Sequence, residues 1–229
     1  IHADSCCQKT RPLVALWGDS HSSSLYPGLN YLQEKFEFGL TQLTQAGCPP
    51  IFYLEKLKYS IRCNEINNNV FSGLVKTRPD IIILHAAWRH DDYPLSNEEL
   101  GVRIKQTIAQ IKIRLPDSKI ILVGPVPRWN DSPQKEAFNY WKNSLKKTEA
   151  IPPYLNANVL LDVEITLIGV ASDLSVNYLS STDILCFDSK CLWRVGGGKE
   201  DFLAVDYGHL SRAGSIYLAE KLFPHLKIK

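Results

Sequence analysis

The 229 residues are 45% hydrophobic and 22% charged, a composition that fits one sizeable domain needing neither a metal nor a disulfide framework to fold. The formal net charge is +2 with Lys and Arg scattered along the chain, which excludes the basic footprint of a nucleic-acid-binding protein. No stretch approaches the roughly 18 consecutive apolar residues of a membrane helix. The sequence opens at Ile1 and contains no methionine, so we expect a fragment cut from a longer protein, with a mature secreted protein as the alternative.

The first 70 residues predict two strands with a helix between them. The apolar run 13–17 ends at Gly18-Asp19 and is typical of a buried strand. A helix beginning at Ser23 or Ser24 would keep Pro27 in its first turn, where a proline loses no hydrogen bond. Its apolar face comprises Leu25, Leu29, Leu32 and Phe36. We expect a second strand over 38–44, a turn at 47–50 and a disulfide-tied loop over 51–70.

The middle of the chain continues this alternation. A strand is predicted over 81–86, and Ser96 with Glu99 forms a capping box at the start of a helix. The predicted buried face of this helix is Leu100, Ile104, Ile108, Ile111 and Leu115. A further strand follows over 120–123. Ser132-Pro133 then indicates a helix start, and the face expected to be buried carries Phe138, Trp141 and Leu145.

The last third is less regular. We expect a strand over 159–163 and irregular surface loop over 164–205, followed by a final helix capped by Ser211. The apolar face of the final helix comprises Leu210, Ala213, Tyr217, Leu218 and Leu222. Strands alternating with helices predict a parallel sheet covered on both faces, and therefore an α/β fold in a single domain spanning 1–229.

Four of the six cysteines flank two loops, and such pairs suggest local disulfides in an oxidising compartment. One pair is Cys48 and Cys63, and the other is Cys186 and Cys191. Reduced thiols in a cytosolic protein are the alternative. The neighbouring pair at positions 6 and 7 has no assigned partner.

A serine directly after the first strand is the first candidate for chemistry. Ligands of open parallel sheets bind beyond the carboxyl ends of the strands, and Ser20 lies there at the start of a helix. Backbone N–H groups at a helix start can stabilise an oxyanion. The alternative is that Gly18-Asp19-Ser20 only caps the helix. It is not the nucleophile elbow of the α/β-hydrolases, because residue 22 is serine rather than glycine.

A second candidate lies before the last helix, where Asp206 and His209 are three residues apart. One turn can present both side chains to a single point. A catalytic triad needs that relation, with the carboxylate holding the imidazole tautomer while the other ring nitrogen faces the serine. The alternative is again a helix cap beside a solvated histidine.

Gly18-Asp19-Ser20 near the start and Asp206-x-x-His209 near the end together resemble the signature of the SGNH (GDSL-type) hydrolases. Several further features look like one branch of that family, the SGNH domains fused to membrane-bound acyltransferase-3 proteins, and most closely like the O-antigen acetyltransferases of Gram-negative bacteria. These features are Gly18-Asp19-Ser20-His21-Ser22, Gly47-Cys48-Pro49-Pro50, Cys63, Trp88 and Asp206-x-x-His209-Leu210-Ser211.

The resemblance implies a flavodoxin-like α/β/α sandwich that acetylates a cell-surface polysaccharide such as the O-antigen of lipopolysaccharide. It implies Ser20 as nucleophile, with Asp206 and His209 as the base pair. The acetyl donor would be delivered by a preceding membrane acyltransferase domain, ultimately from acetyl-CoA, and no cofactor or metal would be bound. Residues 1–12 would form the link to that membrane domain, and the chain would lie in the periplasm on an inner-membrane protein.

One departure from the family concerns the oxyanion hole. The wider family has a Gly-x-Asn-Asp block after the third strand, whose asparagine donates to the oxyanion. This chain has His85-Ala86-Ala87-Trp88-Arg89-His90 at that place. The oxyanion donors would then be the backbone N–H groups of Ser20 and Gly47, together with a group at Trp88 or Arg89.

Other readings rest on fewer residues. A metal site formed by His85, His90, Asp91 and Asp92 has poor ligand spacing, and Gly196-Gly197-Gly198-Lys199 lacks the serine or threonine of a phosphate loop. Aromatic side chains that could stack on sugar rings are Trp129, Tyr140, Trp141 and Trp193. Two further functions stay open: an esterase that uses the same triad with water as acceptor, and a glycan-presenting module with a degenerate site.

Overall fold

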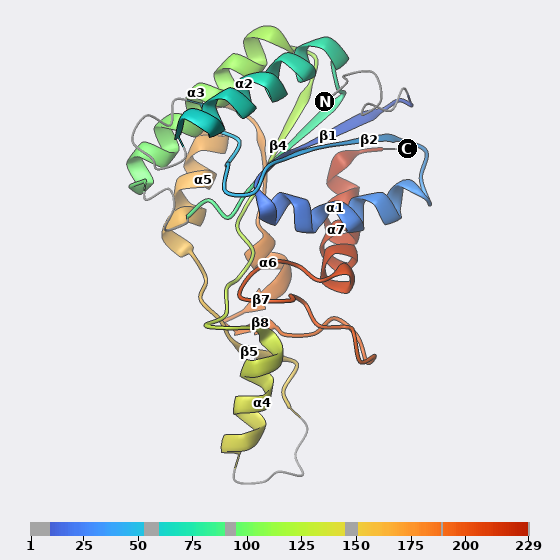
Figure 1. The fold of residues 1–229 in the computed structure, drawn as a ribbon, viewed down its shortest axis with the longest axis vertical. Coiled ribbons are helices and arrows are strands. Elements are labelled where there is room, and N and C mark those ends of the chain that lie inside the picture. The colour runs from blue at the N-terminus through green and yellow to red at the C-terminus, as the bar shows by residue number, and fades with distance from the viewer. Residues whose placement is uncertain (1–9, 53–59, 90–94, 145–150, 189, 229) are drawn as a thin grey trace.

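The structure is a computed structural model that describes residues 10–52, 60–89, 95–144, 151–188 and 190–228. Its centre is a sheet of five parallel strands in the order β2-β1-β3-β4-β6 (Figure 1). The strands are β1 (Leu13–Gly18), β2 (Gly39–Thr44), β3 (Ile81–His85), β4 (Lys119–Val123) and β6 (Asn177–Leu179). This order is that of the flavodoxin-like doubly wound folds, and it confirms the α/β class predicted from the sequence.

Helices cover both faces of the sheet (Figure 1). One face carries α2 (Ser60–Thr77), α3 (Asn97–Arg114) and α5 (Leu161–Asp173), and the other carries α1 (Ser20–Gln33) and α7 (Arg212–Leu226). Successive side chains of a strand point to opposite faces. Ile82 and Leu84 of β3 therefore pack into the first apolar cluster, and Ile81 and Ile83 pack into the second. Burial on both faces explains why β1, β3 and β4 are nearly continuous apolar runs.

Helices α1 and α7 pack in close contact, which brings the two ends of the sequence together. The backbone N–H of Gly28 donates to the Ser215 hydroxyl at 2.8 Å. A Cβ at position 28 would lie 2.1 Å from the carbonyl oxygen of Ser215, so only glycine fits this crossing. Because α1 begins directly after β1 and α7 begins directly after residues 206–211, the contact holds both segments at the carboxyl edge of the sheet.

A smaller layer lies below the main sheet in Figure 1, and α4 projects from it. Its elements are α4 (Pro133–Asn143), β5 (Tyr154–Asn156), α6 (Ser181–Leu185), β7 (Cys186–Phe187) and β8 (Lys190–Leu192). The three strands form an antiparallel sheet in the order β5-β8-β7. Ala137, Leu155 and Trp193 make a separate small core between this sheet and α4.

Several predicted helix starts are confirmed. The capping box of Ser96 and Glu99 opens α3, and the hydroxyls of Ser132 and Ser211 cap α4 and α7. The predicted start of the first helix was wrong. It begins at Ser20 because the Asp19 side chain accepts the backbone N–H of His21 as an N-cap. Pro27 therefore lies inside the helix rather than in its first turn.

The loop expected over 51–70 was also wrong, because α2 begins at Ser60; residues 53–59 lie outside the described part of the chain. One inward-facing residue of α2 is polar, so the apolar residues of this helix do not show a clear helical period in the sequence. The buried Asn67 amide donates to the carbonyls of Pro49 and Ile51, and its oxygen accepts the indole N–H of Trp17. A buried polar group is stable when it is hydrogen-bonded in this way, and a hydrophobic pattern does not reveal it.

Two further expectations fail in the last third. No strand spans 159–163; α5 begins at Leu161, and its buried residues Val163, Leu167 and Val170 follow helical spacing. The expected loop over 164–205 contains this helix and then β6, α6, β7 and β8. These elements are short, with strands of two or three residues, which is too little for a period of two to appear in the sequence.

The face of α4 that was expected to be buried is exposed. Phe138 and Trp141 are 56% and 38% exposed, whereas Pro133 and Ala137 are buried. Leu145, assigned to the same face, lies outside the described residues. The prediction placed the large aromatic side chains in the core. The core beneath this helix is small, and it accommodates Ala137 instead.

Candidate active site

The turn between β1 and α1 places Ser20 at the carboxyl edge of the sheet, where it is the first residue of the helix. Asp19 is 2% exposed, and its carboxylate connects two segments. One oxygen accepts the backbone N–H of His21 at 2.8 Å, and the other accepts that of Ala87 at 2.9 Å. Asp19 therefore fixes both the helix start and the segment that follows β3. Sequence reasoning assigned it no role beyond a cap.

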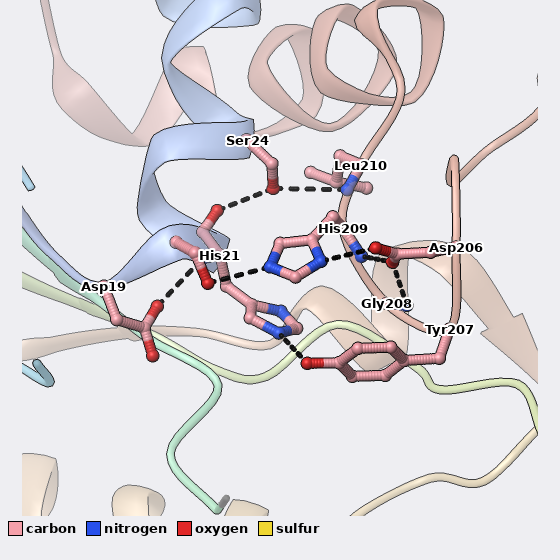
Figure 2. A network of polar contacts seen from close by, with 9 residues as sticks. Asp19, His21, Ser24, Asp206, Tyr207, Gly208, His209 and Leu210 are labelled. Atoms are coloured by element: carbon pink, nitrogen blue, oxygen red, sulfur yellow. Dashed lines mark hydrogen bonds and ion pairs between the residues drawn. The ribbon is translucent and has the colours of Figure 1, made fainter. Parts of the chain in front are cut away.

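Ser20, His209 and Asp206 form a continuous chain of hydrogen bonds. Figure 2 labels His209 and Asp206 of this chain and marks the contact between them. His209 Nε2 lies 2.8 Å from the Ser20 hydroxyl, and His209 Nδ1 lies 2.8 Å from an oxygen of Asp206. The structure thus brings together the two candidate motifs, which are 189 residues apart in the sequence. The three side chains stand within the distances that the nucleophile, base and orienting carboxylate of a triad require.

The hydrogen bonds to the other oxygen of Asp206 determine that Asp206 is ionised, and therefore which nitrogen of His209 carries the proton. This oxygen accepts the backbone N–H groups of Gly208 and His209 at 3.0 and 2.8 Å. Burial raises the pKa of Asp206, but these two bonds and the bond from the His209 ring outweigh it, so the pKa lies below its usual range. An ionised carboxylate only accepts hydrogen bonds, so His209 Nδ1 carries the proton and Nε2 is the acceptor that faces Ser20.

Hydrogen bonds on two sides hold the segment that carries Asp206 and His209. The backbone N–H of Leu210 donates to the Ser24 hydroxyl at 3.2 Å, which ties it to the first turn of α1. The backbone N–H of Trp129 donates to the Tyr207 carbonyl at 2.8 Å. These bonds hold His209 against Ser20 without any contribution from bound substrate.

An imidazole packs against the candidate base. The ring of His21 is buried and lies with its centroid 4.5 Å from that of His209, at an interplanar angle of 37°. The Tyr207 hydroxyl lies 3.5 Å from His21 Nε2 (Figure 2). His21 thus contacts the candidate base on one face and limits its rotation.

Gly47 lies in a tight turn after β2. The N–H of Cys48 donates to the carbonyl of Gln45 at 3.0 Å, and Gly47 has a φ of +70°, which is the geometry of a type II turn. The N–H of Gln45 donates to the carbonyl of Gly18 at 3.0 Å, so the turn stands beside the end of β1. A disulfide joins Cys48 to Cys63 of α2 and fixes the turn from the other side.

The Trp88 side chain is not available to a substrate. Its indole N–H donates to the Val123 carbonyl at 2.7 Å, and the residue is 1% exposed. Any contribution of Trp88 to an oxyanion hole must therefore come from its backbone. That backbone is unusual, because Trp88 has a φ of +57°.

The metal site suggested by the sequence is only partly described. His85 is fully buried with its ring beside the Val123 carbonyl, and burial lowers its pKa. The remaining proposed metal ligands, at 90–92, lie outside the described residues, and no group of three or more metal-binding side chains occurs among those that are described. Trp129 and Trp193 are buried, whereas Tyr140 and Trp141 are partly exposed on α4.

Both expected disulfides are present, Cys48–Cys63 and Cys186–Cys191. Cys6 and Cys7 lie outside the described residues. Within the ranges that the structure describes, no helix is long and apolar enough to cross a membrane.

The fold and the Ser-His-Asp arrangement are those of an SGNH protein. A family model described as the SGNH domain fused to AT3 domains matches residues 2–224, and the chain belongs to that family. AT3 denotes the acyltransferase-3 domains expected from the sequence. No curated protein matches the chain.

Solved structures agree with this membership. The periplasmic domain of the lipopolysaccharide acetyltransferase of Salmonella ser. Paratyphi A is 27% identical with a TM-score of 0.88, over 98% of this chain and 87% of that one. A variant of an acetyl-xylooligosaccharide esterase from Geobacillus is 11% identical with a TM-score of 0.54, over 95% and 94% of the two chains. TesA is 12% identical with a TM-score of 0.56, over 94% and 98%. The last two likenesses concern the fold alone.

Proposed function

We propose that this chain is an O-acetyltransferase domain that transfers an acetyl group through Ser20 to a sugar hydroxyl of a cell-surface polysaccharide. The observation that carries the proposal is the hydrogen-bonded chain Ser20–His209–Asp206, with distances of 2.8 and 2.8 Å, at the carboxyl edge of the sheet. The likeness to the Salmonella periplasmic domain supports the choice of an acetyl group and of lipopolysaccharide as the acceptor. Within lipopolysaccharide, we propose that the O-antigen carries the hydroxyl.

In the first half-reaction, His209 Nε2 takes the proton of the Ser20 hydroxyl as the oxygen attacks the acetyl carbonyl. Asp206 keeps the proton of His209 on Nδ1 and stabilises the imidazolium that forms. His209 then protonates the leaving group of the donor, and the acetyl ester of Ser20 remains. In the second half-reaction, His209 removes the proton of a sugar hydroxyl, which attacks this ester and releases Ser20.

Three backbone N–H groups are the proposed oxyanion donors. Ser20 contributes the first amide of α1, which also lies at the positive end of the helix dipole. Gly47 contributes an amide from the turn beside β1, and Trp88 contributes its backbone amide from the segment after β3. Backbone donors would replace the side-chain amide of the asparagine that this chain lacks.

The family model associates this domain with AT3 domains, and we infer that such a membrane domain supplies the acetyl group, ultimately from acetyl-CoA. The same association, and the periplasmic location of the Salmonella domain, support a periplasmic position on an inner-membrane protein of a Gram-negative bacterium. The triad itself uses neither a metal nor a cofactor in the steps above.

The test compares the wild-type domain with Ser20→Ala in acetate release from p-nitrophenyl acetate. Ser23→Ala is the matched control, because Ser23 is an exposed serine of the same helical turn. We expect turnover in wild type and in the control, and none above background in Ser20→Ala. Equal turnover in all three proteins would overturn Ser20 as nucleophile, and no turnover in any would favour the glycan-presenting alternative.

Adding oligosaccharide acceptors to the same assay separates transfer from hydrolysis. Acetylated sugar is the product expected of the transferase. Free acetate alone, at every acceptor concentration, would assign the triad to an esterase.

A further inference from the structure

The segment after β3 lies beside the candidate nucleophile. In the parallel pair β1 and β3, Gly18 is opposite His85. Beyond this pair, the carboxylate of Asp19, the residue before Ser20, accepts the backbone N–H of Ala87 at 2.9 Å. Trp88 therefore directly follows a residue that is hydrogen-bonded to the neighbour of Ser20.

The backbone at Trp88 forms a strained turn. The N–H of Arg89 donates to the Ala87 carbonyl at 2.7 Å, two residues back, while Trp88 has a φ of +57°. A three-residue turn of this kind with positive φ at its centre is the rare and strained form of γ-turn, and an aromatic residue rarely adopts it. Such conformations persist only where the surroundings determine them, and they cluster at functional sites.

Three contacts hold this turn, and all of them come from residues that are distant in the sequence. Asp19 binds the N–H that enters it, and the Trp88 indole is anchored on Val123. The third is Arg128, whose Nη2 donates to the Ala87 carbonyl at 3.2 Å and also to the carbonyl of Arg89. The guanidinium thus joins the carbonyls on either side of Trp88.

Arg128 also touches the segment that carries the base. Its guanidinium carbon lies 5.8 Å from the centre of the Tyr207 ring, and the next residue, Trp129, binds the Tyr207 carbonyl. The backbone N–H and carbonyl of Arg128 are paired with the backbone of Asn158 at 3.0 and 2.6 Å. These two bonds fix the backbone from which the arginine side chain extends. One side chain therefore sits between the turn at Trp88 and the segment of His209.

We propose that Arg128 is a positioning residue that holds the strained turn at Trp88 so that the Trp88 N–H completes the oxyanion hole. The guanidinium binds the carbonyls of Ala87 and Arg89. This arrangement leaves the backbone N–H of Trp88 unpaired with the neighbouring backbone carbonyls that the structure describes. This N–H makes no hydrogen bond within the part of the chain that the structure describes. The inference rests on the proposed function, because it assigns a part in the same acetyl transfer.

The experiment measures kcat and KM for p-nitrophenyl acetate in wild type, Arg128→Ala and Arg128→Lys. A displaced oxyanion donor weakens binding of the transition state more than binding of the substrate, so we expect kcat to fall about 10- to 100-fold in Arg128→Ala while KM changes little. Lysine keeps the charge but not the planar fork of donors, and we expect it to restore less than half of the lost rate. Because His209 is untouched, the shape of the pH–rate profile should not change.

Arg11→Ala is a matched control at the opposite edge of the sheet. Arg11 also donates to two carbonyls, those of Thr77 and Arg78, and Arg78 also has a positive φ of 46°. We expect this control to lower the melting temperature without lowering kcat. An equal loss of kcat in both arginine variants would overturn the inference, since it would reflect general loss of structure.

Added guanidinium at non-denaturing concentration is the second readout. We expect it to raise the kcat of Arg128→Ala and not that of Arg11→Ala or wild type. An Arg128→Ala enzyme with wild-type kcat would overturn the role of Arg128 while leaving the proposed function intact. Loss of the difference between wild type and Ser20→Ala would instead overturn the proposed function itself.

Discussion

At the scale of single residues, the two carboxylate oxygens of Asp206 accept different hydrogen bonds. The substitution Asp206→Asn therefore tests which nitrogen of His209 must carry the proton. One oxygen accepts two backbone N–H groups and the other accepts His209 Nδ1–H. In Asp206→Asn the amide oxygen must stay with the two backbone donors, so the amide NH₂ faces Nδ1. His209 then carries its proton on Nε2 and cannot act as base toward Ser20.

We therefore expect Asp206→Asn to lose about 10³- to 10⁴-fold in kcat with p-nitrophenyl acetate, while its melting temperature stays close to that of wild type. Asp206→Ala removes the backbone bonds as well, and it should lose both activity and stability. A fully active Asp206→Asn protein would show that the tautomer of His209 does not limit the reaction.

The same residues show how far a sequence can predict a site. Ser20, Asp206 and His209 stand in short motifs beside predicted helix starts, so their meeting follows from one parallel sheet with both segments at its carboxyl edge. Arg128 has no such signal, because it lies in an irregular segment about 40 residues from Trp88 and about 80 from Tyr207. The contacts of its guanidinium depend on where those segments meet in the fold.

At the scale of elements, the Cys48–Cys63 disulfide connects the Gly47 turn to α2. It closes a 15-residue separation, and its removal in Cys48→Ser/Cys63→Ser should cost about 2–4 kcal/mol of stability. Because Cys48 directly follows Gly47, we also expect kcat for p-nitrophenyl acetate to fall by roughly 10-fold as the Gly47 amide loses its fixed position.

The second disulfide supplies the control. Cys186→Ser/Cys191→Ser opens a separation of five residues within the small antiparallel sheet, which contains none of the triad residues. We expect a smaller loss of stability there and no change in kcat. If the two double variants lost kcat equally, the first disulfide would have no particular role at the oxyanion hole.

A buried carboxyl between α5 and β6 predicts a dependence of stability on pH. Glu164 is 5% exposed, and burial raises its pKa above 4.5 although the hydroxyl of Tyr178 donates to it. The nearby charge of Asp183 acts in the same direction as burial. A carboxyl with a raised pKa in the folded state contributes stability that is fully present below its unfolded pKa and is lost as the pH rises through the folded value.

Glu164→Gln removes this titration. We expect the melting temperature of the variant, relative to wild type, to increase between about pH 5 and about pH 8. Thermal unfolding of both proteins across that range gives the measurement. A difference in melting temperature that does not vary with pH would mean that Glu164 ionises in the folded protein as it does in the unfolded chain.

The sequence did not predict helices and strands that bury a polar side chain or that are only a few residues long. The helix α2 turns the Asn67 amide inward, and β6, β7 and β8 have only two or three residues each. The main strands and α3 were predictable because they bury continuous or periodic apolar residues. Four of the five strands of the central sheet thus follow from the sequence, whereas β6 and the strands of the small layer do not.

At the scale of the whole molecule, the proposed reaction needs an acetyl donor, and the donor is inferred to come from an AT3 domain. The isolated domain and the membrane-fused protein should therefore differ in product. With an activated ester, the isolated domain has a donor but no arranged polysaccharide, so water competes for the acetyl group on Ser20. In the fused protein the acetyl donor and the polysaccharide would meet at the same triad.

We expect cells that carry the full-length protein to acetylate their surface polysaccharide, and cells that carry Ser20→Ala in that protein to lose the modification. Ser23→Ala is the control, and equal amounts of all three proteins in the membrane exclude a folding defect. Acetylation by Ser20→Ala at the wild-type level would mean that the membrane domain transfers the acetyl group without this triad. The SGNH domain would then present the glycan, and Ser20 would react only with artificial esters.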